Sequence, residues 1–158
     1  METTISITPI GKVLKENGMF IIELEKEYLP ALIGIEGFSH LQIIWWGHLL
    51  DKPENRKVLI TNKPYKTGPE VLGIYATHSP VRPNPILITT IAVASFDKVK
   101  GRIATGYIDA EPGTPILDIK PYHKNERIRD CRVPDWCSHW PDWNEDSATF
   151  DWQKEFNF

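Results

Sequence analysis

The sequence lacks the short motifs that identify the commonest nucleotide-binding and hydrolytic folds. It contains no Gly-x-Gly-x-x-Gly, no Gly-x4-Gly-Lys-Ser/Thr and no Gly-x-Ser-x-Gly. These absences leave a Rossmann-type fold, a phosphate-binding loop and a nucleophile elbow without support. No apolar run approaches the ~20 residues of a membrane-spanning helix. Two cysteines among 158 residues make no disulfide framework, which predicts a cytoplasmic protein.

The chain also lacks an excess of positive charge. Lys and Arg total 18 against 21 Asp and Glu, a formal net charge of −3. A uniformly basic nucleic-acid-binding surface is thereby excluded, but a local basic stripe is not. One such cluster does occur, with four basic residues close to two acidic ones: Lys124, Arg127, Arg129 and Arg132 beside Glu126 and Asp130.

Thirteen prolines disfavour a helical bundle, and short apolar runs between turn residues favour β-structure. Asn17-Gly18 predicts a type I′ hairpin between residues 13–16 and 19–24. Further strands are expected at 40–50 (buried on both faces), 71–76, 86–96, 102–109 and 116–120, with a short helix at 27–33. Because no long helices separate these strands, the predicted class is all-β, mainly antiparallel, as a barrel or sandwich.

The amino-acid composition of the sequence changes near Tyr122. Residues 124–158 are acidic and rich in tryptophan and phenylalanine, and so aromatic a segment is rarely left in water. We therefore expect a β-domain over residues 1–123 and a C-terminal extension over 124–158, packed on that domain or on a partner subunit.

The segment from Thr77 to Pro85 is the most unusual in the chain. Its three prolines restrict the backbone and hold the intervening residues extended. Arg82 and Asn84 are thus presented with little conformational entropy left to lose, which suits a binding site. The alternative is an ordinary proline-rich loop whose arginine meets a surface carboxylate.

A second polar segment follows at residues 109–122. If 116–120 is a regular strand, Asp118 and Lys120 share one face with Ile116. That face is either a polar patch at a site or simply exposed. His40, His48 and His78 are further candidates, since histidine titrates near neutral pH. Cys131, Cys137, His139 and His123 do not have the compact spacing of a zinc site, so no metal is predicted.

Three ordered motifs give the chain a family resemblance. They are Glu36-Gly37-Phe38-Ser39-His40-Leu41, Arg82-Pro83-Asn84-Pro85-Ile86, and the run from Gly113-Thr114-Pro115 to Lys120-Pro121-Tyr122, with Ile10-Gly11-Lys12-Val13 also similar. The chain resembles the TsaA-like family, also called TrmO. The resemblance implies a single-sheeted β-barrel, a homodimer, and S-adenosyl-L-methionine as the cofactor, held near the subunit interface without a Rossmann fold.

The resemblance also implies the site. By motif position, the cofactor contacts are expected at His48, Leu49, His78, Ile88, Gly106, Tyr107, Ile108 and Asp109. Arg82, Asn84, Asp118 and Lys120 lie in the signature segments and are the expected catalytic residues. Where family members carry a Gln-Pro-Gly-like segment, this chain runs straight from Val13 to Asn17-Gly18.

The function implied is that of an S-adenosylmethionine-dependent methyltransferase acting on N6 of threonylcarbamoyl-adenosine beside the tRNA anticodon. Methyl transfer from a sulfonium requires alignment of the nucleophile, the methyl carbon and the sulfur, and a proton acceptor such as Asp118 or a histidine. Two alternatives stay open: a paralogue that methylates a small molecule, and a non-catalytic barrel that binds the cofactor or a protein partner.

Overall fold

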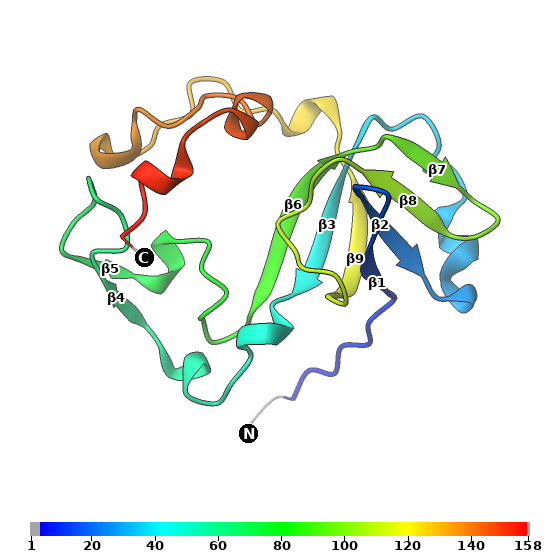
Figure 1. Cartoon of the computed structure of the whole chain (residues 1–158), viewed down its shortest axis with the longest axis horizontal. Helices are drawn as coiled ribbons and strands as arrows, with labels where there is room; N and C mark the ends of the chain where they lie inside the picture. The colour runs from blue at the N-terminus through cyan, green and yellow to red at the C-terminus, as the bar shows by residue number, and fades with distance from the viewer. Residues whose placement is uncertain (1–3, 158) are drawn as a thin grey trace.

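The computed structural model describes residues 4–157. Residues 1–3 of the predicted β-domain and residue 158 of the predicted C-terminal extension lie outside the described range. Short strands dominate the fold (Figure 1). The strands are β1 (Gly11–Glu16), β2 (Met19–Leu24), β3 (His40–Trp46), β4 (Ile60–Asn62), β5 (Val71–Gly73), β6 (Ile86–Ala92), β7 (Ser95–Asp97), β8 (Arg102–Thr105) and β9 (Pro115–Pro121). The helices are short 3-10 turns: η1 (Lys26–Leu32), η2 (His48–Leu50), η3 (Asn55–Lys57), η4 (Ile74–Ala76), η5 (Lys124–Glu126), η6 (Asp135–Cys137), η7 (Glu145–Ala148) and η8 (Trp152–Lys154).

Seven strands form one antiparallel sheet in the order β6-β3-β9-β1-β2-β8-β7, and β4 and β5 form a separate pair. The edge strands β6 and β7 follow each other in the chain, joined by Val93 and Ala94. The N–H of Val93 donates to Ser39 O and that of Ala94 to Ala104 O, both at 2.8 Å, so this stretch leaves β3 and continues along β8. The antiparallel class is confirmed. The predicted closed barrel is not, since no β6–β7 ladder is found among residues 4–157.

The predicted first hairpin is confirmed. β1 pairs with β2 from Gly11 opposite Leu24 to Glu16 opposite Met19. Asn17 and Gly18 have φ values of 49° and 80°, the left-handed backbone that a type I′ turn requires. The expected helix at 27–33 is present as η1, and residues 98–101 join β7 to β8, which pair with each other.

The strand predicted over residues 40–50 is wrong in two respects. β3 ends at Trp46. Gly47 still donates its N–H to Pro85 O at 2.8 Å, in register with the β3–β6 pairing, but its ψ of 56° turns the backbone into η2 at residues 48–50. Only one face is buried: Leu41, Ile43 and Trp45 alternate with partly exposed neighbours. Their side chains join the core inside the curl of the sheet, which is centred on fully buried aliphatic residues: Val13, Ile22, Ile43, Ile103 and Ile116.

Strand β9 contains an irregularity that the sequence pattern did not predict. Ile44 pairs with Asp118 and Trp45 with Ile116, so Leu117 is an extra residue at a β-bulge. The bulge reverses the side-chain alternation, and Ile116 therefore faces the core while Asp118 lies on the outer face with Lys120. The predicted sharing of one face by all three residues is wrong.

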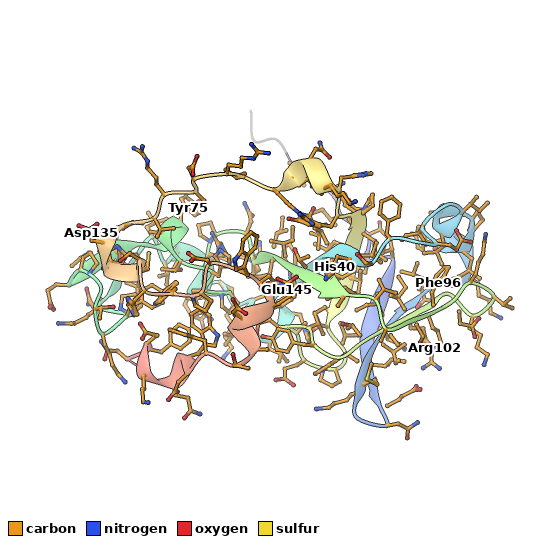
Figure 2. All side chains as sticks on the ribbon, turned by 90° about the horizontal axis from the view of Figure 1, so that it is seen from above. His40, Tyr75, Phe96, Arg102, Asp135 and Glu145 are labelled. Carbon is orange, nitrogen blue, oxygen red and sulfur yellow. The ribbon has the colours of Figure 1, made fainter. Side chains whose placement is uncertain are left out.

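The C-terminal segment packs against the region between β4 and β5. Tyr65 is 8% exposed, and its ring centroid lies 5.1 Å from that of Trp136, 5.2 Å from Trp140 and 5.7 Å from Phe156. Figure 2 places Tyr75 and Asp135 at the opposite end of the molecule from Phe96 and Arg102. We call residues 134–157 the aromatic tail. No helix of the described chain is long and apolar enough to cross a membrane.

Candidate functional site

Two adjacent cavities lie at the end of the sheet where β3 stops. The first, of about 380 Å³, is bounded by the β1–β2 hairpin, η2 and the loop that precedes β9. The second, of about 390 Å³, is bounded by η4, the proline-rich loop and β6. Trp45 and Asp109 line both cavities. Each volume lies in the range of small-molecule sites, and the shared walls make the two cavities one candidate site.

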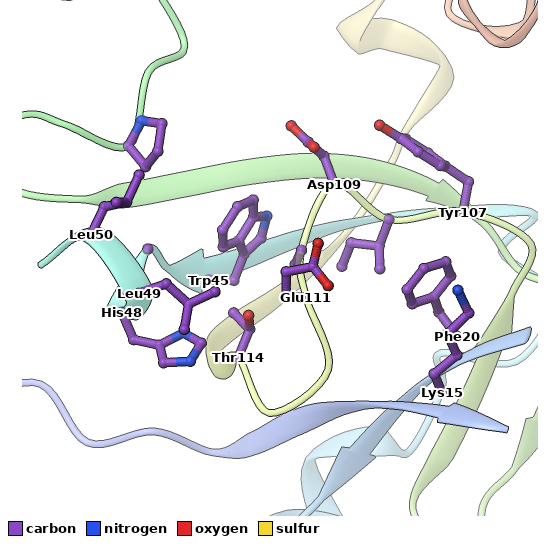
Figure 3. Close-up of a pocket in the computed structure, with 14 residues that line it drawn as sticks. Lys15, Phe20, Trp45, His48, Leu49, Leu50, Tyr107, Asp109, Glu111 and Thr114 are labelled. Atoms are coloured by element: carbon purple, nitrogen blue, oxygen red, sulfur yellow. The ribbon is translucent and has the colours of Figure 1, made fainter.

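The first cavity collects five of the predicted cofactor contacts. His48 and Leu49 come from η2, and Tyr107, Ile108 and Asp109 from the loop between β8 and β9. Figure 3 shows His48 and Leu49 on one side and Tyr107 and Asp109 across from them. Because these segments are far apart in sequence, it is the curl of the sheet that brings them together.

Four more of the predicted site residues line the second cavity. His78, Arg82, Asn84 and Ile88 line it together with Asp109. Burial raises the pKa of Asp109, and the negative charge of Glu111 adds to this, while nearby His78 acts in the opposite direction. The carboxyl group therefore binds its proton more readily than an aspartate in water.

The proline-rich loop is held by its own hydrogen bonds. The Thr77 hydroxyl donates to Ile74 O at 2.8 Å and accepts from Ser79 N at 3.2 Å. Nη1 of Arg82 donates to Thr77 O at 3.2 Å, and its guanidinium lies 5.7 Å from the centroid of the Tyr75 ring. These hydrogen bonds join Arg82 to the backbone of its own loop, and the stiffness expected of the loop stays a prediction.

Three predicted site residues line neither cavity. Gly106 is exposed, immediately before the lining residue Tyr107. Asp118 and Lys120 pair with each other at 2.8 Å on the outer face of β9, with half or more of each side chain accessible to solvent. The bulge at Leu117 is the reason, since it fixes which side chains of β9 point away from the core.

Sequence reasoning missed several lining residues: Lys15, Phe20, Trp45 and Tyr75. Two of these residues, Lys15 and Phe20, could have been identified from the predicted hairpin. Once Asn17-Gly18 sets the register, Lys15 lies directly opposite Phe20, and Nζ of Lys15 is 5.0 Å from the Phe20 ring centroid. The hairpin therefore brings a cation to the wall of the first cavity.

The cysteine and histidine residues considered as metal ligands differ in exposure and in their contacts. Cys131 is exposed and Cys137 is buried, and His139 contacts Glu155 at 2.8 Å. Within residues 4–157, no three His, Cys, Asp or Glu side chains are grouped so that they could hold a metal ion.

A curled antiparallel sheet with a ligand-sized, partly polar cavity at one end defines a small-molecule-binding β-domain. The family model described as the tRNA-methyltransferase O N-terminal domain matches residues 3–126. The chain belongs to this family, which confirms the resemblance found in the sequence. The match ends within η5, so most of the C-terminal segment lies beyond it.

Individual relatives agree with the family assignment. A probable S-adenosyl-L-methionine-binding protein of Pyrococcus horikoshii is 36% identical over 115 residues, covering 72% of this chain and 79% of its own. An S-adenosyl-L-methionine-binding protein of Archaeoglobus fulgidus is 32% identical over 101 residues, 64% of this chain and 67% of its own. A crystal structure of TrmO from Pseudomonas aeruginosa has a TM-score of 0.62 at 26% identity and covers 82% of this chain. The chain spans only 62% of that TrmO.

Proposed function

We propose that this chain is an S-adenosyl-L-methionine-dependent methyltransferase. The observation that carries the proposal is the meeting of the two cavities at Trp45 and Asp109, with most of the expected cofactor contacts on their walls. The names of the two archaeal relatives, which specify binding of S-adenosyl-L-methionine, support the same cofactor. When bound, this cofactor supplies an electrophilic methyl group on a sulfonium.

The first cavity offers a partner for each part of the cofactor. Leu49, Ile108 and Trp45 provide apolar walls suited to an adenine ring. The carboxylate of Asp109 can accept hydrogen bonds from the ribose hydroxyls. Lys15 forms no ion pair among the described residues, and its ammonium group suits the carboxylate of the methionine portion.

We propose N6 of threonylcarbamoyl-adenosine in tRNA as the methyl acceptor, on the basis of family membership. The second cavity lies beside the first and carries Asn84, whose amide can both donate to and accept from a base edge. Nitrogen methylation requires an acceptor for the N6 proton. We assign that role to His78 or Asp109, which line the second cavity. Asp118 and Lys120 line neither cavity and are left out of the proposed site.

We infer that the curled sheet is a single-sheeted β-barrel and that two copies of the chain associate as a dimer next to the two cavities. Only Val93 and Ala94 separate the edge strands β6 and β7. Large apolar side chains are exposed around the cavities: Ile86 is 42% exposed, Ile88 52% and Leu49 61%. Burial of these side chains against a second copy would remove apolar surface from water. Sedimentation of the full chain tests this, and a monomer at all concentrations would contradict it.

The cofactor site is tested by calorimetry with two matched variants. Asp109→Asn and Asp118→Asn remove the same charge, but only the first changes a cavity wall. A hydrogen bond to a charged group contributes about 1.5–3 kcal/mol, so we expect Asp109→Asn to bind S-adenosyl-L-methionine about ten- to a hundredfold more weakly. Asp118→Asn should bind it as the wild type does. Equal affinities for all three proteins would refute the site.

The cation assigned to the cofactor carboxylate has its own pair of variants. Lys15→Met removes the ammonium group from the cavity wall and retains the length of the side chain, while Lys12→Met does the same at an exposed position of the same strand. We expect only Lys15→Met to weaken binding of the cofactor. A loss of affinity in Lys12→Met of the same size would contradict the assignment.

The reaction is tested by incubating the protein with cofactor and total tRNA and identifying nucleosides by mass spectrometry. The expected product is the N6-methylated threonylcarbamoyl-adenosine. Cofactor binding without transfer to tRNA, but with transfer to a small molecule, would instead favour the paralogue. Cofactor binding without any transfer would favour the non-catalytic barrel.

A further inference from the structure

Residues 124–133, which we call the basic strap, lead from the end of β9 to the aromatic tail (Figure 1). Four basic side chains project from this segment, and all are exposed: Lys124, Arg127, Arg129 and Arg132. In the described part of the chain, none of the four takes part in an ion pair with an acidic side chain. The carboxylate of Glu126, within the same segment, accepts the backbone N–H of His123 at 2.5 Å.

The chain has a net negative charge, but its acidic and basic residues are unevenly distributed along the sequence. The last 25 residues contain six acidic side chains and one lysine, so residues 1–133 contain 17 basic and 15 acidic residues. The part that carries the site and the basic strap is therefore slightly positive. The net negative charge, which would disfavour a polyanionic partner, is thus confined to the aromatic tail.

The distance between the basic strap and the cavities constrains the ligand that could use both. β9 begins next to Thr114, which lines the first cavity, and ends at Pro121, shortly before the basic strap. Seven residues of strand span roughly 20 Å. A nucleoside is too small to reach both places, whereas a polynucleotide with a base in the cavity extends that far and carries a phosphate at every nucleotide.

We infer that the basic strap binds backbone phosphates of the RNA whose base enters the cavities. The inference rests on the proposed function, because it takes the substrate to be an RNA. The exposed, unpaired guanidinium groups can each donate two parallel hydrogen bonds to a phosphate. The acidic tail repels the RNA backbone, so the two oppositely charged segments also orient the bound RNA along the basic strap and away from the tail.

The test measures binding of fluorescently labelled tRNA to the full-length protein, by anisotropy, between 50 and 200 mM salt. The double variant Arg127→Gln/Arg129→Gln removes two charges from the basic strap. The double variant Lys98→Gln/Lys100→Gln removes two charges from the β7–β8 turn and is the matched control. Each lost phosphate contact reduces the slope of log K against log salt by about 0.7–0.9.

We expect the strap variant to lose about 1.4–1.8 from that slope and to bind tRNA about ten- to a hundredfold more weakly at 50 mM salt. The control should match the wild type, and both variants should bind S-adenosyl-L-methionine normally. Equal tRNA affinities for wild type and strap variant would overturn the inference while leaving the proposed function standing. No tRNA binding by the wild type would overturn RNA as the substrate itself.

A second copy of this chain is the rival occupant, because its acidic tail could pair with the basic strap. Sedimentation of the same variants distinguishes the two. A strap variant that loses tRNA binding but keeps its oligomeric state supports the inference. A strap variant that dissociates into monomers and keeps its tRNA affinity overturns it, and assigns the basic strap to self-association.

Discussion

Replacement of Tyr65 by alanine should release the aromatic tail from the rest of the chain. Tyr65 is nearly buried and touches three rings of the tail. Loss of a buried aromatic side chain destabilises by about 3–5 kcal/mol. Burial raises the pKa of its hydroxyl group, which therefore remains neutral. No hydrogen bond from that hydroxyl is found in the described chain, so Tyr65→Phe should be almost neutral and serves as the control.

Limited proteolysis measures the effect. When local opening is fast relative to cleavage, the cleavage rate follows the population of the open form. A tenfold change corresponds to 1.4 kcal/mol, so Tyr65→Ala should speed cleavage within residues 134–157 by about a hundred- to a few-thousandfold. Four of the six tryptophans lie in the tail, and their fluorescence reports its release. Equal cleavage of the alanine and phenylalanine variants would refute the reasoning.

Four further variants test the fold and the site. A Cβ at Gly11 would lie 2.2 Å from the carbonyl oxygen of Glu23, so Gly11→Ala should lower stability by about 1–3 kcal/mol or more in thermal unfolding. Because the pKa of Asp109 is raised in the native state, the unliganded protein loses stability as pH rises from about 3.8 toward that raised value. Asp109→Asn should remove this loss, giving a flatter profile and higher stability at pH 7 in urea titrations. Asp118→Ala and Lys120→Ala should leave methyl transfer unchanged, and a slower rate in either would contradict their placement outside the site.

Signals within a few residues of each other predicted structure well. Asn17-Gly18 fixed both the turn and the register of the first hairpin, because few other residues adopt that backbone. The end of β3 could not be predicted in the same way. The apolar run continues to Leu50, and the strand stops because the backbone leaves the extended conformation at Gly47 (φ −71°, ψ 56°) and enters η2.

The candidate site depended on information that periodicity does not carry. A single extra residue at Leu117 changes which side chains of β9 face outward, so the alternation rule gave Asp118 the wrong companions. The family motifs indicated residues of which most line a cavity, since these motifs lie on segments that converge. They did not identify Trp45, which reads as a core residue and yet separates two cavities. The predicted domain boundary between residues 123 and 124 stays a prediction.

The aromatic tail and the basic strap change what the net charge says about function. Salt screens exposed charges beyond roughly 10 Å at 0.1 M, so an approaching RNA responds to the charges near its own path and not to the sum over the chain. Tyr65 anchors the tail at the β4–β5 pair through Trp136, Trp140 and Phe156, whereas Glu145 of the tail lies near the middle of the molecule (Figure 2). If Tyr65→Ala frees the tail, its acids can move toward the basic strap, and tRNA affinity should fall although no basic residue has been changed. Unchanged tRNA binding by that variant, with the tail shown to be released, would mean that the tail's charge has no influence on the strap.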